Sequence, residues 1–120
     1  MAHILIVEDD ESVRSFTARA LQASGHEIDV AEDGDEGLER VAASAGAYDL
    51  VLSDIRMPVM DGIAMAREIA ARFPRQKVLL MTGYAEQRER AVELEGIIAG
   101  VVPKPFNLAQ IRDEVSRALR

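Results

Sequence analysis

Short apolar runs alternate with segments of helical periodicity along the whole chain. Five runs rich in valine, isoleucine and leucine predict strands, at residues 3–7, 27–31, 48–53, 77–81 and 100–102. Apolar residues at three- and four-residue spacing predict five helices, at residues 11–24, 34–45, 85–96 and 107–119 and between Asp61-Gly62 and Pro74. The first and last helices should each bury one apolar stripe, made of Val13, Phe16, Ala20 and Leu21 in the first and of Leu108, Ile111, Val115 and Leu119 in the last.

This alternation predicts an α/β fold. Parallel strands need right-handed crossovers long enough to hold a helix, so the helices should cover both faces of a parallel sheet. The apolar runs 4–7, 50–52 and 78–81 agree, because strands covered on both faces need no polar side. No repeat, linker or low-complexity segment divides the chain, so we expect one doubly wound, five-stranded domain over residues 1–120.

Composition narrows the class of protein. A chain of 120 residues can bury one core, and its net charge of −7 argues against binding nucleic acid or an anionic membrane. The absence of cysteine excludes disulfides, thiolate metal sites and a cysteine nucleophile. No apolar run approaches the roughly 18 to 20 residues that span a bilayer, so we expect a cytoplasmic protein without membrane partners.

Acidic residues follow two predicted strands, at the edge where this class of sheet binds ligands. Glu8, Asp9 and Asp10 follow the first strand, and Asp54 follows the third. If these strands are neighbours, the carboxylates converge and raise one another's pKa. A divalent cation removes that conflict, and carboxylates without imidazole or thiolate suit Mg²⁺ or Mn²⁺. Because Mg²⁺ usually binds few protein ligands together with phosphate, such a site implies a phosphate-bearing partner.

Three further features of this edge suit phosphoryl chemistry. Lys104 follows the fifth strand and supplies a compact positive charge, and Thr82 follows the fourth and supplies a hydroxyl. A carboxylate such as Asp54 can attack phosphorus and form an aspartyl phosphate. Mg²⁺ and Lys104 would then neutralise the charge on the transferred group.

Four motifs at these positions resemble response-regulator receiver domains of two-component phosphorelays: "ILIVEDD" (4–10), "DLVLSDIRMPVMDG" (49–62), "VLLMTGYA" (78–85) and "VVPKPF" (101–106). The resemblance covers essentially all 120 residues. It implies a flavodoxin-like sheet with strand order 2-1-3-4-5, an order for which a chemotaxis receiver is a standard example. It also implies a phosphoacceptor that is charged by a histidine kinase or phosphotransferase, and not an enzyme beyond self-phosphorylation and slow dephosphorylation.

The resemblance implies a role for each of six residues: Asp54 as phosphoacceptor and metal ligand, Asp9 as main metal carboxylate, Glu8 as a metal ligand through water, Arg56 as a ligand through its backbone carbonyl, Thr82 as switch hydroxyl and Lys104 as phosphate contact. The Lys104–Pro105 bond is expected to be cis. In one place the chain departs from the family, because Val101 stands where receivers commonly carry an aromatic switch residue. Tyr84 is a possible substitute.

The chain ends after its fifth helix, so we expect the signal to leave through a protein-docking surface. The expected surface comprises the helix at 85–96, the strand at 100–102 and the start of the last helix, with arginines around Tyr84, Val101 and Phe106. Among receivers, "MTGYAEQRERA" with "VVPKPFNLAQIR" most resembles the single-domain CpdR type. That likeness implies control of a ClpXP-class protease by the unphosphorylated form.

Other classes fit the pattern less well. A haloacid-dehalogenase-type phosphatase would place its nucleophile in a D-x-D run, whereas "EDDES" has adjacent acids and the chain has no room for a cap. A flavodoxin-like FMN carrier needs a Ser/Thr/Gly-rich loop after the first strand, where this chain is acidic. A pseudo-receiver that docks partners without phosphorylation stays open, although an intact Asp9, Asp54, Thr82 and Lys104 weigh against it.

Each candidate residue also has an ordinary structural interpretation. Asp9 or Asp10 suits a helix N-cap, Asp54 suits a turn before Pro58, Thr82 a strand end and Lys104 a solvated surface charge. The run "EQRER" suits a solvated helical face with a Glu86–Arg90 pair.

Overall fold

The computed structural model describes residues 1–83 and 85–120, apart from the side chains of residues 85–88. Five parallel strands form one sheet in the order β2-β1-β3-β4-β5. The strands are β1 (His3–Val7), β2 (Glu27–Ala31), β3 (Leu50–Asp54), β4 (Val78–Thr82) and β5 (Gly100–Pro103), and the helices are α1 (Glu11–Ala23), α2 (Gly34–Ala43), α3 (Gly62–Arg72), α4 (Ala85–Val92) and α5 (Leu108–Leu119). The α/β fold class and its strand order are confirmed. No helix in the described part of the chain is long and apolar enough to cross a membrane.

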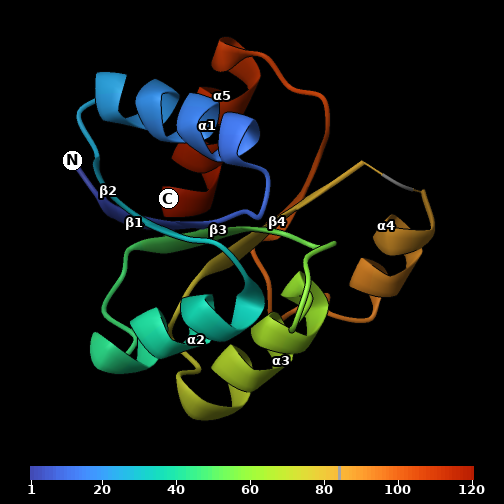
Figure 1. Cartoon of the computed structure of the whole chain (residues 1–120). Coiled ribbons are helices and arrows are strands. Elements are labelled where there is room, and N and C mark those ends of the chain that lie inside the picture. Colours follow the sequence, from blue (N-terminus) through green and yellow to red (C-terminus); the bar gives the residue numbers. More distant parts are fainter. Residues whose placement is uncertain (84) are drawn as a thin grey trace.

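The helices cover both faces of the sheet. Figure 1 shows α1 and α5 together on one face, and α2 and α3 on the other with α4 beside α3. Successive side chains of each strand therefore enter different cores: Ile4 and Ile6 pack with the α1/α5 side, and Leu5 and Val7 with the α2/α3 side. Fully burying one such side chain stabilises the fold by about 1.5–3 kcal/mol.

Side-chain caps set where several helices begin. The Asp10 carboxylate accepts a hydrogen bond from the Val13 backbone N–H at 3.1 Å, which confirms the N-cap interpretation of Asp10. Asn107 and Gln110 form a reciprocal capping box at α5. Each cap fixes the direction in which the chain leaves the carboxyl end of a strand, and these turns carry the candidate site.

Two predicted apolar stripes were partly wrong. Phe16 is 43% exposed and Leu108 is 40% exposed. Thr17 is buried in place of Phe16, because its hydroxyl donates to the Val13 carbonyl at 2.7 Å and so needs no other partner. Phe16 instead lies against Phe106 of the β5–α5 loop, with ring centroids 6.5 Å apart.

Some boundaries also differ from the predictions. Asp54 and Thr82 are the last residues of their strands rather than the first residues after them. The helix predicted over 85–96 ends at Val92, because the chain turns so that Leu94 can reach the core. Tight turns from Leu94 to Ala91 and from Ile97 to Leu94, together with the positive φ of Gly96, replace the last helical turn.

The loop between β3 and α3 folds closely under the end of β3. The Gly62 N–H donates to the Ile55 carbonyl at 2.8 Å, and a Cβ at Gly62 would lie 2.2 Å from the Asp54 carbonyl oxygen. Only glycine permits that approach. Val59 has a φ of 69°, and the Met60 N–H beside it bonds to the Pro58 carbonyl at 2.8 Å. The loop therefore holds a strained turn a few residues from Asp54.

Candidate functional site

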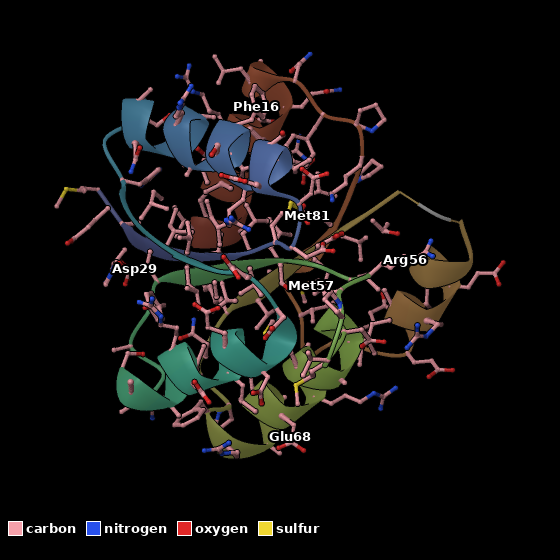
Figure 2. The ribbon with its side chains drawn as sticks, viewed as in Figure 1. Phe16, Asp29, Arg56, Met57, Glu68 and Met81 are labelled. Carbon is pink, nitrogen blue, oxygen red and sulfur yellow. The ribbon has the colours of Figure 1, made fainter. Side chains whose placement is uncertain are left out.

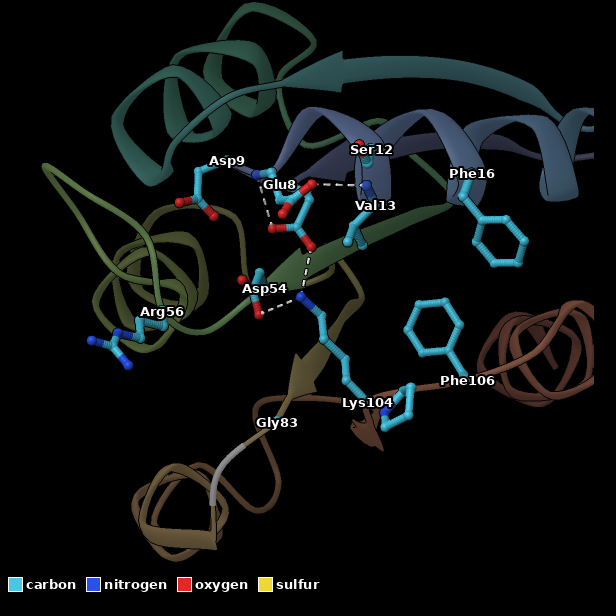
Figure 3. Close-up of a pocket in the computed structure, with 12 residues that line it drawn as sticks. Glu8, Asp9, Ser12, Val13, Phe16, Asp54, Arg56, Gly83, Lys104 and Phe106 are labelled. Carbon is cyan, nitrogen blue, oxygen red and sulfur yellow. Dashed lines mark hydrogen bonds and ion pairs between the residues drawn. The ribbon is translucent and has the colours of Figure 1, made fainter.

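The carboxyl ends of β1, β3 and β5 place acidic and basic side chains together. Because β1 pairs directly with β3, with Val7 opposite Ser53, Glu8 and Asp54 lie side by side at the sheet edge. One carboxylate oxygen from each of Glu8, Asp9 and Asp54 lies within 4.8 Å of the others. Figure 3 shows these acids around one opening, with Lys104 reaching toward them. The predicted convergence of the carboxylates is confirmed.

Lys104 is the counter-ion within this cluster. Its ammonium lies 2.7 Å from Glu8 Oε1 and 3.2 Å from Asp54 Oδ1. The Lys104 side chain is 21% exposed and Glu8 is 1% exposed, so the pair is largely withdrawn from water. Lys104 is therefore not a solvated surface charge. In this cluster the single positive charge of Lys104 faces three carboxylates.

Burial perturbs the protonation of this pair. Burial raises the pKa of Glu8 to about 7, with a further rise from the negative charge of Asp54, while the hydrogen bond from Lys104 opposes the rise. Burial by itself lowers the pKa of Lys104, but the hydrogen bond to Glu8 and the charge of Asp54 outweigh it, so the pKa is raised and Lys104 stays charged. The charge of Asp54 therefore still disfavours ionisation of Glu8, although Lys104 contacts both carboxylates.

Backbone groups hold the other predicted residues at the same edge. The Ile55 N–H donates to Asp54 Oδ1 at 3.1 Å. Thr82 is buried, and its carbonyl accepts from the Lys104 N–H at 2.7 Å, which links the ends of β4 and β5. The Lys104–Pro105 bond is cis, as predicted. Arg56 lines the opening, and Figure 3 shows its side chain directed away from Lys104.

An open cavity of about 710 Å³ lies in front of these groups. Its acidic wall comes from the turn after β1 and from Asp54, and its apolar wall includes Phe16, Val13 and Phe106. Figure 2 marks Phe16 and Arg56 in the whole molecule, and the close-up in Figure 3 shows them on opposite sides of this opening. This aromatic wall was not predicted from the sequence, because helical periodicity assigned Phe16 to the core.

The donor atoms of the cavity fit a hard divalent cation. Three carboxylates converge without imidazole or thiolate, and such oxygen ligands suit Mg²⁺ and Mn²⁺. Burial, together with the negative charge of Asp54, raises the pKa of Glu8, and a bound cation would supply positive charge that favours the ionised carboxylates. Asp9 is exposed, so the site opens to solvent and leaves room for water and substrate oxygens.

The family profile of the response regulator receiver domain matches residues 4–116. The chain belongs to this family. Receivers are phosphoacceptor modules of two-component phosphorelay signalling rather than catalytic enzymes, and they take phosphoryl groups from histidine kinases. Family members bind Mg²⁺ in the acidic pocket that Glu8, Asp9 and Asp54 form in this receiver.

Individual proteins are similar over nearly the whole chain. The response regulator receiver protein CpdR of Brucella abortus is 33% identical, and the match covers 99% of this chain and 98% of that protein. The sensor kinase CckA of the same organism is 37% identical over 98% of this chain, which spans only 12% of the kinase. The response regulator TrrA of Thermotoga maritima, solved in complex with Mg²⁺-BeF, has a TM-score of 0.86 and 34% identity, with coverage of 98% of this chain and 99% of that one.

Two parts of the predicted switch have different outcomes. Val101 is half-buried and lines a groove of about 390 Å³ with Ala91, Val92 and Ile98, and none of the described residues that line this groove is aromatic. Tyr84, the possible substitute, lies outside the described residues.

Proposed function

We propose that Asp54 is the phosphoacceptor of this receiver and that Lys104, Thr82 and a Mg²⁺ or Mn²⁺ ion assist the transfer. The observation that carries the proposal is the position of the Asp54 carboxylate: it ends a buried strand, opens into the cavity and lies 3.2 Å from the Lys104 ammonium. A carboxylate in that position can meet an incoming phosphoryl group, and the nearby ammonium can neutralise its oxygens.

The proposed reaction moves one phosphoryl group from a phosphohistidine to Asp54. A carboxylate oxygen of Asp54 forms the new O–P bond as the P–N bond breaks, and the electron pair of that bond stays on the imidazole nitrogen. Asp9, Asp54 and the Arg56 carbonyl would hold the metal, with Glu8 bound through water. When bound, the metal supplies positive charge to the phosphoryl oxygens. After transfer, the Lys104 ammonium would contact the oxygens of the phosphoryl group on Asp54. The Thr82 hydroxyl would donate a hydrogen bond to one of these oxygens.

Intact-mass measurement after incubation with acetyl phosphate tests this assignment. Wild-type protein should gain one phosphoryl mass only when Mg²⁺ or Mn²⁺ is present, and Asp54→Asn should gain none. Asp61→Asn is the matched control, because Asp61 caps α3 outside the acidic cluster, and it should be labelled like the wild type. Equal labelling of wild type and Asp54→Asn would overturn the proposal.

We further propose that this receiver acts as a single domain and signals by docking a partner protein on the face formed by α4, β5 and the start of α5. The match to CpdR over nearly the full length of both chains supports a CpdR-like role in controlling a ClpXP-class protease, with the unphosphorylated form active. Arg90 of α4 pairs with Asp61 of the α3 cap at 3.1 Å.

A purified ClpX-class unfoldase provides a direct binding test. The unphosphorylated receiver should bind it, and Mg²⁺ with beryllofluoride should release wild type but not Asp54→Asn. In the same samples, amide shift changes should extend from Thr82 to Phe106. If beryllofluoride changes the binding of neither protein, the receiver docks its partner independently of phosphorylation, and the proposed signalling role is wrong.

A further inference from the structure

The Arg14 side chain runs back from the first turn of α1 to the turn that carries the acidic cluster. Its Nη1 donates to the Glu8 carbonyl oxygen at 2.9 Å, and its Nη2 lies 3.9 Å from Glu32 Oε1. The side chain is only 16% exposed. Holding a long charged side chain in one conformation costs entropy, so its contacts must offset that cost. Of the two contacts, only the bond to the Glu8 carbonyl has the length of a good hydrogen bond.

The Glu8 carbonyl belongs to the peptide that joins Glu8 to Asp9, two of the acids proposed to bind the metal. The Glu8 N–H is already bonded to the Ala31 carbonyl of β2 at 3.0 Å, and Asp10 caps α1. The peptide between Glu8 and Asp9 joins these two anchored points. Because a peptide unit is planar, fixing its oxygen also fixes its N–H and the start of Asp9.

Asp9 depends on this backbone more than its neighbours do. Its carboxylate is exposed and, among the residues that the structure describes, makes no hydrogen bond or ion pair, whereas Glu8 and Asp54 are both held by Lys104. The direction of the Asp9 side chain is therefore set by its main chain. Arg14 is the side chain that restrains that main chain from the α1 side.

We propose that Arg14 is a positioning residue of the metal site: by holding the Glu8 carbonyl, it orients Asp9 and Glu8 toward the cation. The inference rests on the proposed function, because it assumes that these acids bind Mg²⁺. Loss of a group that orients metal ligands typically weakens metal affinity about 10- to 100-fold.

A purely electrostatic role would act in the opposite direction. A guanidinium bonded to the Glu8 backbone adds positive charge beside the acidic cluster. If charge alone mattered, removing it would strengthen Mg²⁺ binding, because like charges repel. If Arg14 orients the ligands, removing it weakens binding. The sign of the change separates the two roles.

Titration of the full chain with MgCl₂ at constant ionic strength, followed by backbone amide shifts, tests the inference. Arg14→Met keeps a helix-forming side chain and should raise the Mg²⁺ Kd about 10- to 100-fold. Arg14→Lys keeps one donor and should restore part of the loss. Glu32→Gln removes only the distant ion pair, and its Kd should stay within about twofold of the wild type.

Each outcome bears on one proposal. Unchanged or tighter Mg²⁺ binding by folded Arg14→Met, with normal binding by the wild type, would overturn the positioning role and leave the phosphoacceptor proposal intact. If Arg14→Met does not fold, Arg14→Leu decides, because it also removes the donor to the Glu8 carbonyl, and a Kd equal to that of the wild type would then overturn the role. Failure of the wild type to bind Mg²⁺ would overturn both proposals.

Discussion

Glu8 is a carboxylate that the fold buries almost completely, beside another carboxylate and one ammonium. The 2.7 Å contact with Lys104 favours its charged form, but removal from water and the charge of Asp54 favour the neutral form and prevail, so its pKa is raised to about 7. In the unfolded chain the same group ionises near its ordinary pKa of 4.5. The folded protein therefore binds more protons than the unfolded chain between these two values.

We expect Glu8 to make the metal-free protein lose stability as pH rises from about 4.5 to about 7. In this window folding takes up a proton at Glu8, so each step toward higher pH favours the unfolded chain. Above about 7 both states have lost the proton and the effect levels off. Urea unfolding in EDTA should show that Glu8→Gln, which has no such group, gains stability relative to the wild type across the window. A constant difference between the two proteins from pH 4.5 to 8 would contradict a raised pKa at Glu8.

Among the side chains that the structure describes, two ion pairs join α3 to α4. Arg90 of α4 lies 3.1 Å from Asp61, and Arg67 of α3 lies 3.2 Å from Glu93 just after α4. Asp61 also caps α3 through a 2.8 Å bond from the Ala64 N–H. The Asp61 carboxylate thus connects the end of the loop that starts at Asp54 to the helix on the proposed output face.

A double-mutant cycle should measure this connection. Asp61→Asn keeps the cap, because asparagine caps a helix as well as aspartate does, but it removes the ion pair. Asp61→Asn and Arg90→Gln should each lose about 0.2–1 kcal/mol of unfolding free energy, and the double variant should lose no more than one of them alone. The intrahelical Arg117–Asp113 pair on α5 is the matched control. Removal of this control pair should leave the amide shifts of α4 unchanged. If the losses of unfolding free energy from Asp61→Asn and Arg90→Gln add up in the double variant, the two residues are not coupled.

At the scale of the whole molecule, an acidic chain of net charge −7 concentrates three carboxylates at one edge of its sheet. One ammonium cannot balance them, so the folded state without metal carries an electrostatic cost at this edge. A cation that binds only the folded state repays that cost by mass action.

Thermal unfolding should respond both to metal and to removal of one acid. Without metal, Asp54→Asn should melt at a higher temperature than the wild type, because one repelling charge is gone. Mg²⁺ at roughly tenfold excess over its Kd should stabilise the wild type by about 1.4 kcal/mol and Asp54→Asn by less. NaCl at equal ionic strength controls for screening by salt. If neither Asp54→Asn nor Mg²⁺ changes the melting temperature, the acids do not repel one another.

The sequence by itself determined the parts of this protein that depend on local pattern. Hydrophobic periodicity located every strand and helix, and the polar residues at strand ends identified Glu8, Asp9, Asp54 and Lys104 before any contact was known. These predictions succeed because the side-chain period of a strand and the apolar run of a buried parallel strand are both local patterns of the sequence. The strand order came from the family resemblance and not from periodicity.

Tertiary structure alone decided which distant residues meet. Lys104 bonds to Glu8 across 96 residues of sequence, Phe16 leaves the core to pack against Phe106, and Arg14 turns back to the Glu8 carbonyl. Periodicity shows that a residue faces one side of a helix, but it does not show where along that side the sheet ends and a cavity begins. Those contacts depend on how the strands are ordered and how the loops between them fold, because both the metal site and its supports are assembled from chain segments that are adjacent only in space.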